Sequence, residues 1–442
     1  MDALDLDVTA IAHGGVGVAR DGQGRVVFVA DAIPGERVRA VVAEAKRSFA
    51  RAVAVEVLEA SPDRVPHVWR EASIERAPEA RAGGAEFGHI ALARQRALKG
   101  EVLRDALRRF GGVDDARVEA ALGAGREAAG EAAGGDLETA AGAASSTGDP
   151  VSGDRAADAS GAAEAVRAAP GDAETGGLGW RTRVRLHVGP DGRPGPYAAR
   201  SHRVVPVASL PLAVPGIAAV LEQRFEGAER VDAIATPDGL RLVVGDQVPS
   251  VIEARVGARV LRVDDTGFWQ VHREAPGVLV RAVREAIDPA RFDLAARNLD
   301  LYGGVGLLAS ALADLGGEAT RVETVESDPR ASAHAAENLA ALPAATATAE
   351  RVDRWLRRTE PAGFDGAVVV LDPPRSGAGI GTARAIAALG ATQLVYVACD
   401  PVALARDART LEEAGYRLVR LAGFDLFPHT HHSEAVATFL RR

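Results

Sequence analysis

The sequence predicts an α/β protein with a doubly wound parallel sheet in its carboxyl-terminal half, preceded by a small β-barrel and a central α+β domain. Three observations support this fold class. Strand-like and helix-like segments alternate over residues 263–442, short β-branched runs fill residues 1–60, and mixed patterns lie between them. Repeated strand–helix units form parallel sheets covered by helices. A chain of 442 residues has room for two or three domains of ordinary size.

Residues 1–60 read as closely spaced strands. The runs DLDVTAIA, GVGVAR, RVVFVA and ERVRAVVAEAKRSFARAVAVEVLEA are separated by HGG, DGQG and AIPGE, which are turn sequences typical of antiparallel strands. About five strands in such a length predict a closed, OB-like barrel, a shape that often binds oligonucleotides. Because Phe28 and Phe49 are its only aromatic residues, a purely structural barrel remains the alternative.

Residues 61–113 and 180–262 are expected to form one central α+β domain. The first part begins as a loop and continues as a helix, ALARQRALKGEVLRDALRRF, which Gly111 and Gly112 end. The second part contains a hairpin around GPDGRPG, a helical period in LPLAVPGIAAVLEQRFEG, and strands in VDAIATPDGLRLVVGD and ARVLRVDDTGFWQV.

Residues 114–179 differ in composition from the rest of the chain. They contain 13 acidic residues and 4 arginines, which accounts for the whole net charge of −9. With no aromatic residue and few large aliphatic ones, this stretch is expected to be a disordered insertion, because it buries too little apolar surface to offset its ordering entropy. The flanking segments are near neutral, so they can still present arginine patches to an anionic partner.

Several classes of protein are excluded by composition. The single cysteine, Cys399, forms no disulfide within the chain and excludes a metal site built from thiolates. No run of about 18 apolar residues predicts a membrane span. The acidic amino terminus lacks the pattern of a secretory leader. We therefore expect a cytoplasmic protein, a monomer, without a bound metal.

Residues 263–442 carry the pattern of a nucleoside site. A glycine-rich turn (Gly303, Gly304, Gly306) follows the strand RNLDLY, and Glu326 ends the next strand, RVETVE. Such a turn exposes backbone N–H groups to a ligand, and an acidic residue about 20 positions later accepts hydrogen bonds from ribose. The pattern fits NAD as well as S-adenosylmethionine. The full GxGxxG motif is absent because residue 309 is Ala. A domain that binds no cofactor remains an alternative.

Two further motifs lie at the carboxyl ends of predicted strands in the same domain. In LDPPRSGAG, Asp372 precedes two prolines that make a rigid lip. In VYVACDP, Cys399 stands between an apolar strand and a helix starting near Pro401. A helix amino terminus and a nearby arginine would lower the pKa of a thiol and favour the reactive thiolate. The alternative is a small buried residue.

These motifs resemble those of a known enzyme family. DLYGGVGLLA, VESDP, LDPPRSGAG, YVACDPVALARD and FDLFPHTHHSEAVA are similar, in order, to the motifs of the RNA uracil-5 methyltransferases, class I S-adenosylmethionine enzymes that make 5-methyluridine in transfer and ribosomal RNA. Residues 1–60 resemble the RNA-binding TRAM domain of the ribosomal RNA branch. The resemblance implies a Rossmann-like domain, S-adenosylmethionine as cofactor, and an RNA substrate, ribosomal rather than transfer RNA.

The resemblance also implies roles for individual residues. Uracil C5 is a weak nucleophile until a thiolate adds at C6, after which a base must remove the C5 proton. Cys399 takes the place of the family's nucleophile and Glu434 that of its base. The cofactor positions are Gln270, Tyr302, Gly303, Gly304, Gly306, Glu326, Asp372 and, for the adenine amino group, Asp353. Phe268 is expected to stack on the flipped uracil, and Pro373, Arg375 and His429 to line the substrate pocket.

The chain departs from the family at two places. Ala82, Ala85 and Val65 stand where many ribosomal RNA members have cysteines, so no iron–sulfur cluster is expected. The usual asparagine after the nucleophile is Asp400. The tract HTHH resembles a metal motif but lacks further ligands. Three alternatives remain open: transfer RNA as the substrate, a cytosine target, and an inactive RNA-binding factor. The presence of Cys399 and Glu434 argues against the inactive factor.

Overall fold

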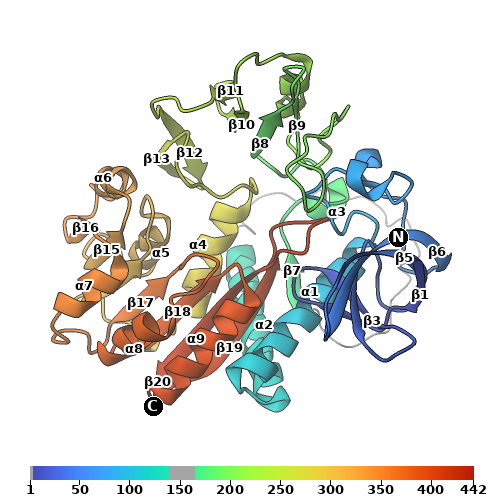
Figure 1. Cartoon of the computed structure of the whole chain (residues 1–442). Coiled ribbons are helices and arrows are strands. Elements are labelled where there is room, and N and C mark those ends of the chain that lie inside the picture. Colours follow the sequence, from blue (N-terminus) through green and yellow to red (C-terminus); the bar gives the residue numbers. More distant parts are fainter. Residues whose placement is uncertain (1–2, 139–164) are drawn as a thin grey trace, which may run out of the picture.

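The computed structural model describes residues 3–138 and 165–442. Figure 1 shows three regions: a β-barrel formed by the amino-terminal strands, a group of short sheets above the centre, and a large sheet flanked by helices that contains the carboxyl terminus. Within the described residues, no helix has both the length and the apolar character needed to cross a membrane.

The barrel is one curled sheet. Its strands are β1 (Ala3–Asp7), β2 (Ala10–Ala12), β3 (Val16–Arg20), β4 (Val26–Ala30), β5 (Arg37–Ala45) and β6 (Phe49–Glu59), in the order β1-β5-β6-β4-β3-β2. Only Val8 and Thr9 separate the two edge strands, so the sheet returns on itself. The predicted first strand therefore bends into two. Alternate residues such as Val27 and Val29 are completely buried inside.

The middle of the chain forms two small sheets and a connecting helix. Strands β8 (Arg183–Val188), β9 (Pro194–Gly195), β10 (Arg230–Thr236) and β11 (Gly239–Val244) form a sheet, and β12 (Val251–Val256) pairs with β13 (Arg259–Asp264). Helix α1 (Leu92–Ala106), continued by one π-helical turn (Leu107–Gly111), contacts both β2 of the barrel and α9 (Pro401–Glu413) of the carboxyl-terminal region.

Short 3-10 turns complete this region, at Arg70–Ala72, Pro78–Ala80 and Ile217–Glu222. The last of these replaces the helix predicted from the period of LPLAVPGIAAVLEQRFEG. Gly216 adopts a left-handed φ of 93°, so a regular α-helix does not run through this residue, and a 3-10 turn follows it.

The carboxyl-terminal sheet has eight strands in the order β16-β15-β14-β17-β18-β20-β19-β7. The strands are β7 (Val166–Ala168), β14 (Asn298–Leu301), β15 (Val322–Glu326), β16 (Ala345–Ala349), β17 (Val368–Leu371), β18 (Gln393–Ala398), β19 (Tyr416–Asp425) and β20 (Glu434–Arg441). Neighbours from β16 to β18 run parallel, and β20 is antiparallel to β18 and β19. This is the doubly wound, Rossmann-like sheet that the sequence predicted.

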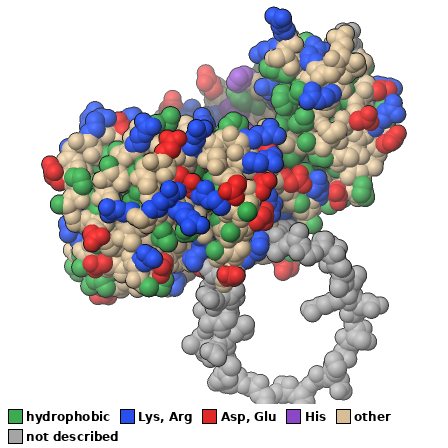
Figure 2. Space-filling model, turned by 90° about the horizontal axis from the view of Figure 1, so that it is seen from below, with side chains coloured by type: hydrophobic (Ala, Val, Ile, Leu, Met, Phe, Trp, Pro, Cys, Tyr) green, Lys and Arg blue, Asp and Glu red, His purple; other side chains and the backbone are tan. Residues whose placement is uncertain are grey.

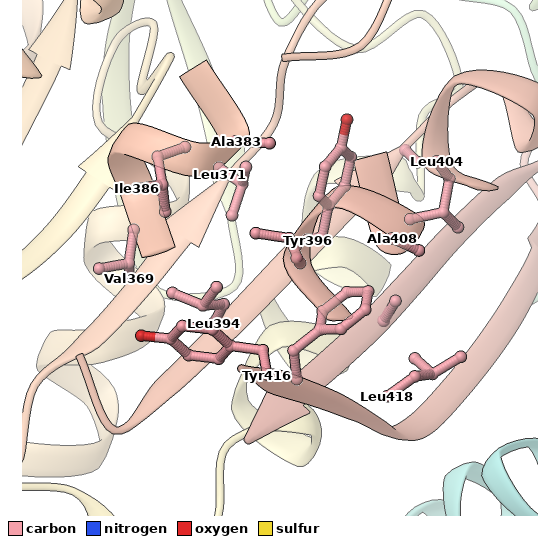
Figure 3. Close-up of a cluster of buried hydrophobic side chains, with 14 of the residues drawn as sticks. Val369, Leu371, Ala383, Ile386, Leu394, Tyr396, Leu404, Ala408, Tyr416 and Leu418 are labelled. Atoms are coloured by element: carbon pink, nitrogen blue, oxygen red, sulfur yellow. The ribbon is translucent and has the colours of Figure 1, made fainter. Parts of the chain in front are cut away.

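Helices cover both faces of this sheet. They are α4 (Ala275–Ala286), α5 (Leu307–Gly316), α6 (Pro329–Asn338), α7 (Val352–Arg358), α8 (Ile380–Ala388) and α9, with a 3-10 turn at Pro289–Arg291. Figure 3 shows the packing on one face, where Leu371, Leu394 and Tyr396 of the strands point toward Ile386 of α8 and Leu404 of α9. All residues of β17 and β18 are buried, because parallel strands are covered on both sides.

The prediction of a disordered insertion over residues 114–179 was wrong at both ends. Helix α2 (Asp115–Glu138) packs on β19, and Val118, Ala121 and Leu122 are buried in the main core. These three positions are spaced i, i+3 and i+4, so they share one face of the helix. Strand β7 adds an eighth strand parallel to β19, and α3 (Asp172–Thr175) follows it. The part of the prediction that concerns residues 139–164 lies outside the described residues.

Candidate active site

The sheet register brings the predicted catalytic residues to one edge. Ala398 of β18 pairs with Ala435 of the antiparallel strand β20. The next residues at that end of the ladder are Cys399 and Glu434, which therefore face each other. Tyr302 and Asp372 follow Leu301 and Leu371 at the carboxyl ends of β14 and β17, and those two leucines are register partners. Doubly wound sheets place their ligands at this edge.

Cys399 is a protonated thiol in the resting protein. Burial raises its pKa to about 12, the nearby carboxyls of Glu434 and Asp372 add to the increase, and Arg375 opposes it. The sequence-based expectation of a lowered pKa was therefore wrong. Although α9 begins two residues later and an arginine is close, burial and the two carboxyl groups outweigh them.

The two carboxyl groups beside Cys399 are also perturbed. Burial raises the pKa of Glu434 well above its usual value, and the charge of Asp372 adds to that. Burial raises the pKa of Asp372 to about 7. A third carboxyl, that of Asp300 in β14, is fully buried, and its pKa is raised to about 8, chiefly by desolvation. This edge of the sheet therefore resists further negative charge and favours a ligand that carries positive charge.

The glycine turn after β14 is held tightly in place. A Cβ on Gly303 would lie 1.9 Å from Thr324 Oγ1, so no larger residue fits there. Tyr302 adopts a left-handed φ of 61°. The Gly304 N–H donates to Glu326 Oε2 over 3.1 Å, and the Ala309 N–H of α5 donates to Asp300 Oδ2 over 2.9 Å. Asp300 was not predicted as a site residue, although it is a carboxylate within the otherwise apolar end of a strand.

Cys399 opens into a cavity of about 200 Å³ between the barrel and the sheet. The cavity is lined by Cys399, Asp400 and Pro401, by Arg375, by His431, His432 and Ser433, by Phe87, Leu98, Lys99 and Val102, and by His13, Gly14 and Gly15 of the barrel. Two of the predicted site residues, Cys399 and Arg375, thus meet here. The contribution of the barrel was not predicted.

The proposed contact between His429 and the substrate does not fit this geometry. Its backbone N–H donates to Gln95 Oε1 over 2.7 Å, its Nδ1 lies 3.0 Å from Gln95 Nε2, and its Nε2 lies 2.8 Å from the Gly176 carbonyl. The side chain is buried, and both ring nitrogens are engaged. His429 fixes the β19–β20 loop to α1, whereas His431 and His432 line the cavity.

Other predicted residues lie around this edge. Asp353, in the first turn of α7, accepts hydrogen bonds from Arg351 (3.0 Å) and Arg357 (3.1 Å), and its charge contributes to the raised pKa of Tyr302, after burial and Asp407. Gln270 and Pro373 are buried. The Phe268 side chain is 78% exposed, so it is accessible to a base but contacts little of the protein.

The positions where related enzymes carry cysteines are filled by apolar packing. Ala82 and Ala85 are buried in a cluster with Trp69, Trp180 and Leu212. Across residues 3–138 and 165–442, no group of three or more His, Cys, Asp or Glu side chains could hold a metal ion.

A second, larger cleft runs from the catalytic cavity between the barrel and strand β8. It has a volume of about 840 Å³ and shares Gly14, Gly15 and His431 with the cavity. Its lining includes the aromatic rings of Phe28, Trp69, His187 and Tyr197, and it mixes the basic residues Arg51, Arg81, Arg181, Arg185 and Arg200 with the acidic residues Asp31, Glu44, Glu79 and Glu86. The rings of His187 and Tyr197 stack with centroids 3.5 Å apart and planes 9° apart. Grooves of this kind suit a single nucleic acid strand.

Basic residues are not gathered on every face. In the view of Figure 2, arginine and lysine side chains are interspersed with acidic ones across the molecule. Positive charge on that face is therefore diluted by acidic side chains.

Sequence and structure comparisons agree with the chemistry of this edge. A family model described as tRNA (Uracil-5-)-methyltransferase matches residues 335–442, and one described as TRAM domain matches residues 3–55. An RNA methyltransferase of Streptomyces avermitilis is 37% identical and aligns over 99% of this chain and 98% of its own. A 23S rRNA (uracil(1939)-C(5))-methyltransferase of Halomonas elongata is 28% identical over 98% of this chain and 88% of its own.

A solved structure shares the whole fold. The tRNA (uracil-54, C5)-methyltransferase of Pyrococcus abyssi, in complex with S-adenosyl-L-homocysteine, superposes with a TM-score of 0.65 at 18% identity and covers 99% of both chains. At this identity the likeness concerns the fold, including the arrangement of barrel, central region and Rossmann-like sheet.

Proposed function

Because the chain belongs to the S-adenosylmethionine-dependent RNA uracil-5-methyltransferase family, we propose that it methylates C5 of a uridine in 23S ribosomal RNA, with Cys399 as nucleophile and Glu434 as base. One observation carries the residue assignment: Cys399 and Glu434 face each other across the β18–β20 ladder at the ligand edge of the sheet. An inactive RNA-binding factor would have no need for this pair.

The residues at the sheet edge fit the cofactor. The turn of Gly303, Gly304 and Gly306 would hold the amino-acid part of the cofactor, and Glu326 would bind its ribose hydroxyls. Tyr302 and Asp372 would line the pocket between these two groups. When bound, S-adenosylmethionine supplies an electrophilic methyl group on a positively charged sulfur. The raised pKa values of Asp300, Asp372 and Glu434 indicate an edge where a cation is stabilising.

Each protein group then has a defined task. Cys399 loses its proton and its Sγ adds to C6 of the uracil, which makes C5 nucleophilic. After C5 is methylated, Glu434 removes the C5 proton, the C5–C6 double bond re-forms and the Sγ–C6 bond breaks. Arg375 lowers the pKa of both groups, so it favours their reactive, ionised forms.

The choice of ribosomal RNA rests on one support, the Halomonas relative, which is named as a 23S rRNA enzyme. The TRAM barrel, which adjoins the catalytic cavity, supports an RNA substrate of either kind. The alternative is transfer RNA, the substrate named for the Pyrococcus enzyme of the same fold. The cleft with the His187–Tyr197 stack would guide the strand on either side of the flipped uridine.

The test is methylation in vitro. The protein is incubated with methyl-labelled S-adenosylmethionine and with transcripts of 23S ribosomal RNA or transfer RNA, and the digested nucleosides are separated. We expect labelled 5-methyluridine from the ribosomal transcript. Label only on transfer RNA would overturn the substrate assignment, and absence of label on both would overturn the activity. Mapping the labelled nucleotide identifies the target.

A further inference from the structure

The β2–β3 turn of the barrel contacts the loop that carries the nucleophile. His13 Nε2 lies 2.8 Å from Asp400 Oδ2, and Asp400 directly follows Cys399. The second oxygen of Asp400, Oδ1, accepts a hydrogen bond from the Ala403 N–H over 2.8 Å and caps α9. One carboxylate thus joins the barrel to the start of the helix behind the nucleophile.

The turn fits closely against the catalytic cavity. A Cβ on Gly15 would lie 2.4 Å from His431 Cβ and 2.9 Å from Phe87 Cε1, and the φ of Gly15 is 71°. Gly14 has a φ of 87° and lines the same cavity. Only glycine allows the turn to come this close. The His13–Asp400 contact therefore lies beside a packed junction between barrel and cavity, although the His13 side chain itself is 49% exposed.

The two side chains form an ion pair while His13 is protonated. The hydrogen bond with Asp400 raises the pKa of His13, against burial and the charge of Arg406. Burial alone would raise the pKa of Asp400, but hydrogen bonds from His13 and the Ala403 amide hold it below its usual value. The other charged or titratable side chains lining this cavity are Lys99, Arg375, Cys399, His431 and His432.

We propose that His13 is a positioning residue for methyl transfer, which as an imidazolium holds the barrel on Asp400 and so fixes the distance between barrel-bound RNA and Cys399. The inference rests on the proposed function, because it takes Cys399 as the nucleophile. The asparagine typical of the family would make a neutral hydrogen bond here, whereas Asp400 makes the contact dependent on the charge of His13.

The sign of the pH dependence follows from the raised pKa of His13. The ion pair is complete while His13 is protonated and weakens as the pH rises through its raised pKa. The quantity to measure is kcat/KM for RNA in the native protein divided by that in His13→Gln. Cys399 and Glu434 titrate in both proteins, so their contribution to the pH dependence cancels in this ratio. We expect a ratio of about 3 to 10 near pH 6 that falls toward 1 near pH 9.

Two further variants sharpen the test. Asp400→Asn keeps a good helix cap but removes the charge. Because that charge also raises the pKa of Cys399, the comparison is made within Asp400→Asn, where adding His13→Gln should have little further effect on kcat/KM for RNA. The KM for S-adenosylmethionine should stay unchanged. Arg25→Gln is the matched control, because it breaks the Arg25–Asp21 ion pair at the opposite end of β3. A ratio that does not vary with pH, or additive losses in the double variant, would overturn the proposal.

A direct measurement separates this inference from the proposed function. The imidazole proton signals of His13 are followed by NMR across a pH titration, in the native protein and in Asp400→Asn. We expect a pKa above 6.5 in the native protein and a lower one in the variant. This shift is measurable even if no RNA is methylated, a result that would refute the proposed activity alone. An unchanged pKa of His13 in Asp400→Asn would refute the ion pair itself.

Discussion

Cys399 stands at the position of the proposed nucleophile, but its thiol is protonated and therefore unreactive. Its motif predicted the nucleophile, but the direction of its pKa shift did not follow from the motif. The shift depends on Glu434 and Asp372, which come from other strands and reach Cys399 only in the folded sheet. Short sequence motifs can thus indicate which atom reacts, whereas the electrostatic surroundings become known only with the fold.

The raised pKa values predict how the rate depends on pH. Below about pH 12 the thiolate fraction of Cys399 increases tenfold for each pH unit, and Glu434 must also lose its proton to act as base. Single-turnover methylation of RNA should therefore accelerate from pH 6 to 9. A rate independent of pH over this range would mean that neither deprotonation limits the reaction, or that substrate binding lowers both pKa values.

Glu434 and Cys399 give opposite outcomes when they are replaced. Glu434→Gln should still allow Sγ to add to C6 but should block loss of the C5 proton, so a covalent protein–RNA adduct should accumulate. Cys399→Ala should form no adduct and no 5-methyluridine. Denaturing gel electrophoresis with labelled RNA distinguishes the two, and the double variant is the control. An adduct in Cys399→Ala would show that another side chain is the nucleophile.

Helix α2 shows where reasoning from composition fails. The strands and helices of residues 263–442 could be predicted because apolar residues recur there with a clear period. Residues 114–127 are dominated by Ala, Gly and charged residues, and their average composition conceals Val118, Ala121 and Leu122 on one face. Gly125 also matters, since a Cβ there would lie 2.2 Å from the Leu421 carbonyl oxygen of β19. Small residues thus permit close helix–strand contact.

Packing of α2 on β19 predicts a loss of stability when it is disturbed. Leu122→Ala removes a side chain that is only 2% exposed, and buried Leu→Ala changes destabilise by about 2–5 kcal/mol. Thermal unfolding should therefore start at a lower temperature in Leu122→Ala. The matched control is Leu240→Ala in β11, whose leucine is 36% exposed. Equal effects of the two changes would argue against a packed α2.

Deletion of residues 114–179 has a related expected outcome. This deletion would remove α2 as well as β7, the parallel partner of β19, so both an edge strand and part of the core would be lost. We expect an insoluble or unfolded product, measured as the soluble yield and by circular dichroism. A folded, active deletion protein would show that this segment is dispensable, as its composition alone suggests.

At the scale of the whole molecule, the catalytic cavity is assembled from distant segments. Residues 13–15, 87, 98, 99, 102, 375, 399–401 and 431–433 contribute to it, and no local pattern relates these segments to one another. The domain types and the nucleophile were accessible to sequence reasoning because each depends on a contiguous motif. The cleft was not, because His187 and Tyr197 become a stacked pair only after β8 and β9 fold together.

The cleft predicts how RNA affinity depends on aromatic and basic side chains. Tyr197→Ala removes a stacking surface, and loss of base–aromatic stacking costs about 1–3 kcal/mol per base, so single-stranded RNA should bind about 5- to 150-fold more weakly. Arg200→Gln should instead reduce the salt dependence, because each phosphate contact on a single strand contributes a slope of about 0.7 in log K against log salt. Fluorescence anisotropy at several salt concentrations measures both effects.

Arg384→Gln is the control for this experiment, since Arg384 lies on α8 and outside the lining of the cleft. It should change neither the affinity nor the slope. If Tyr197→Ala and Arg200→Gln bind RNA like the native protein, the strand takes another path to Cys399. If only Arg200→Gln differs, the cleft holds the phosphate backbone without stacking a base, because the two contributions respond to different properties of RNA.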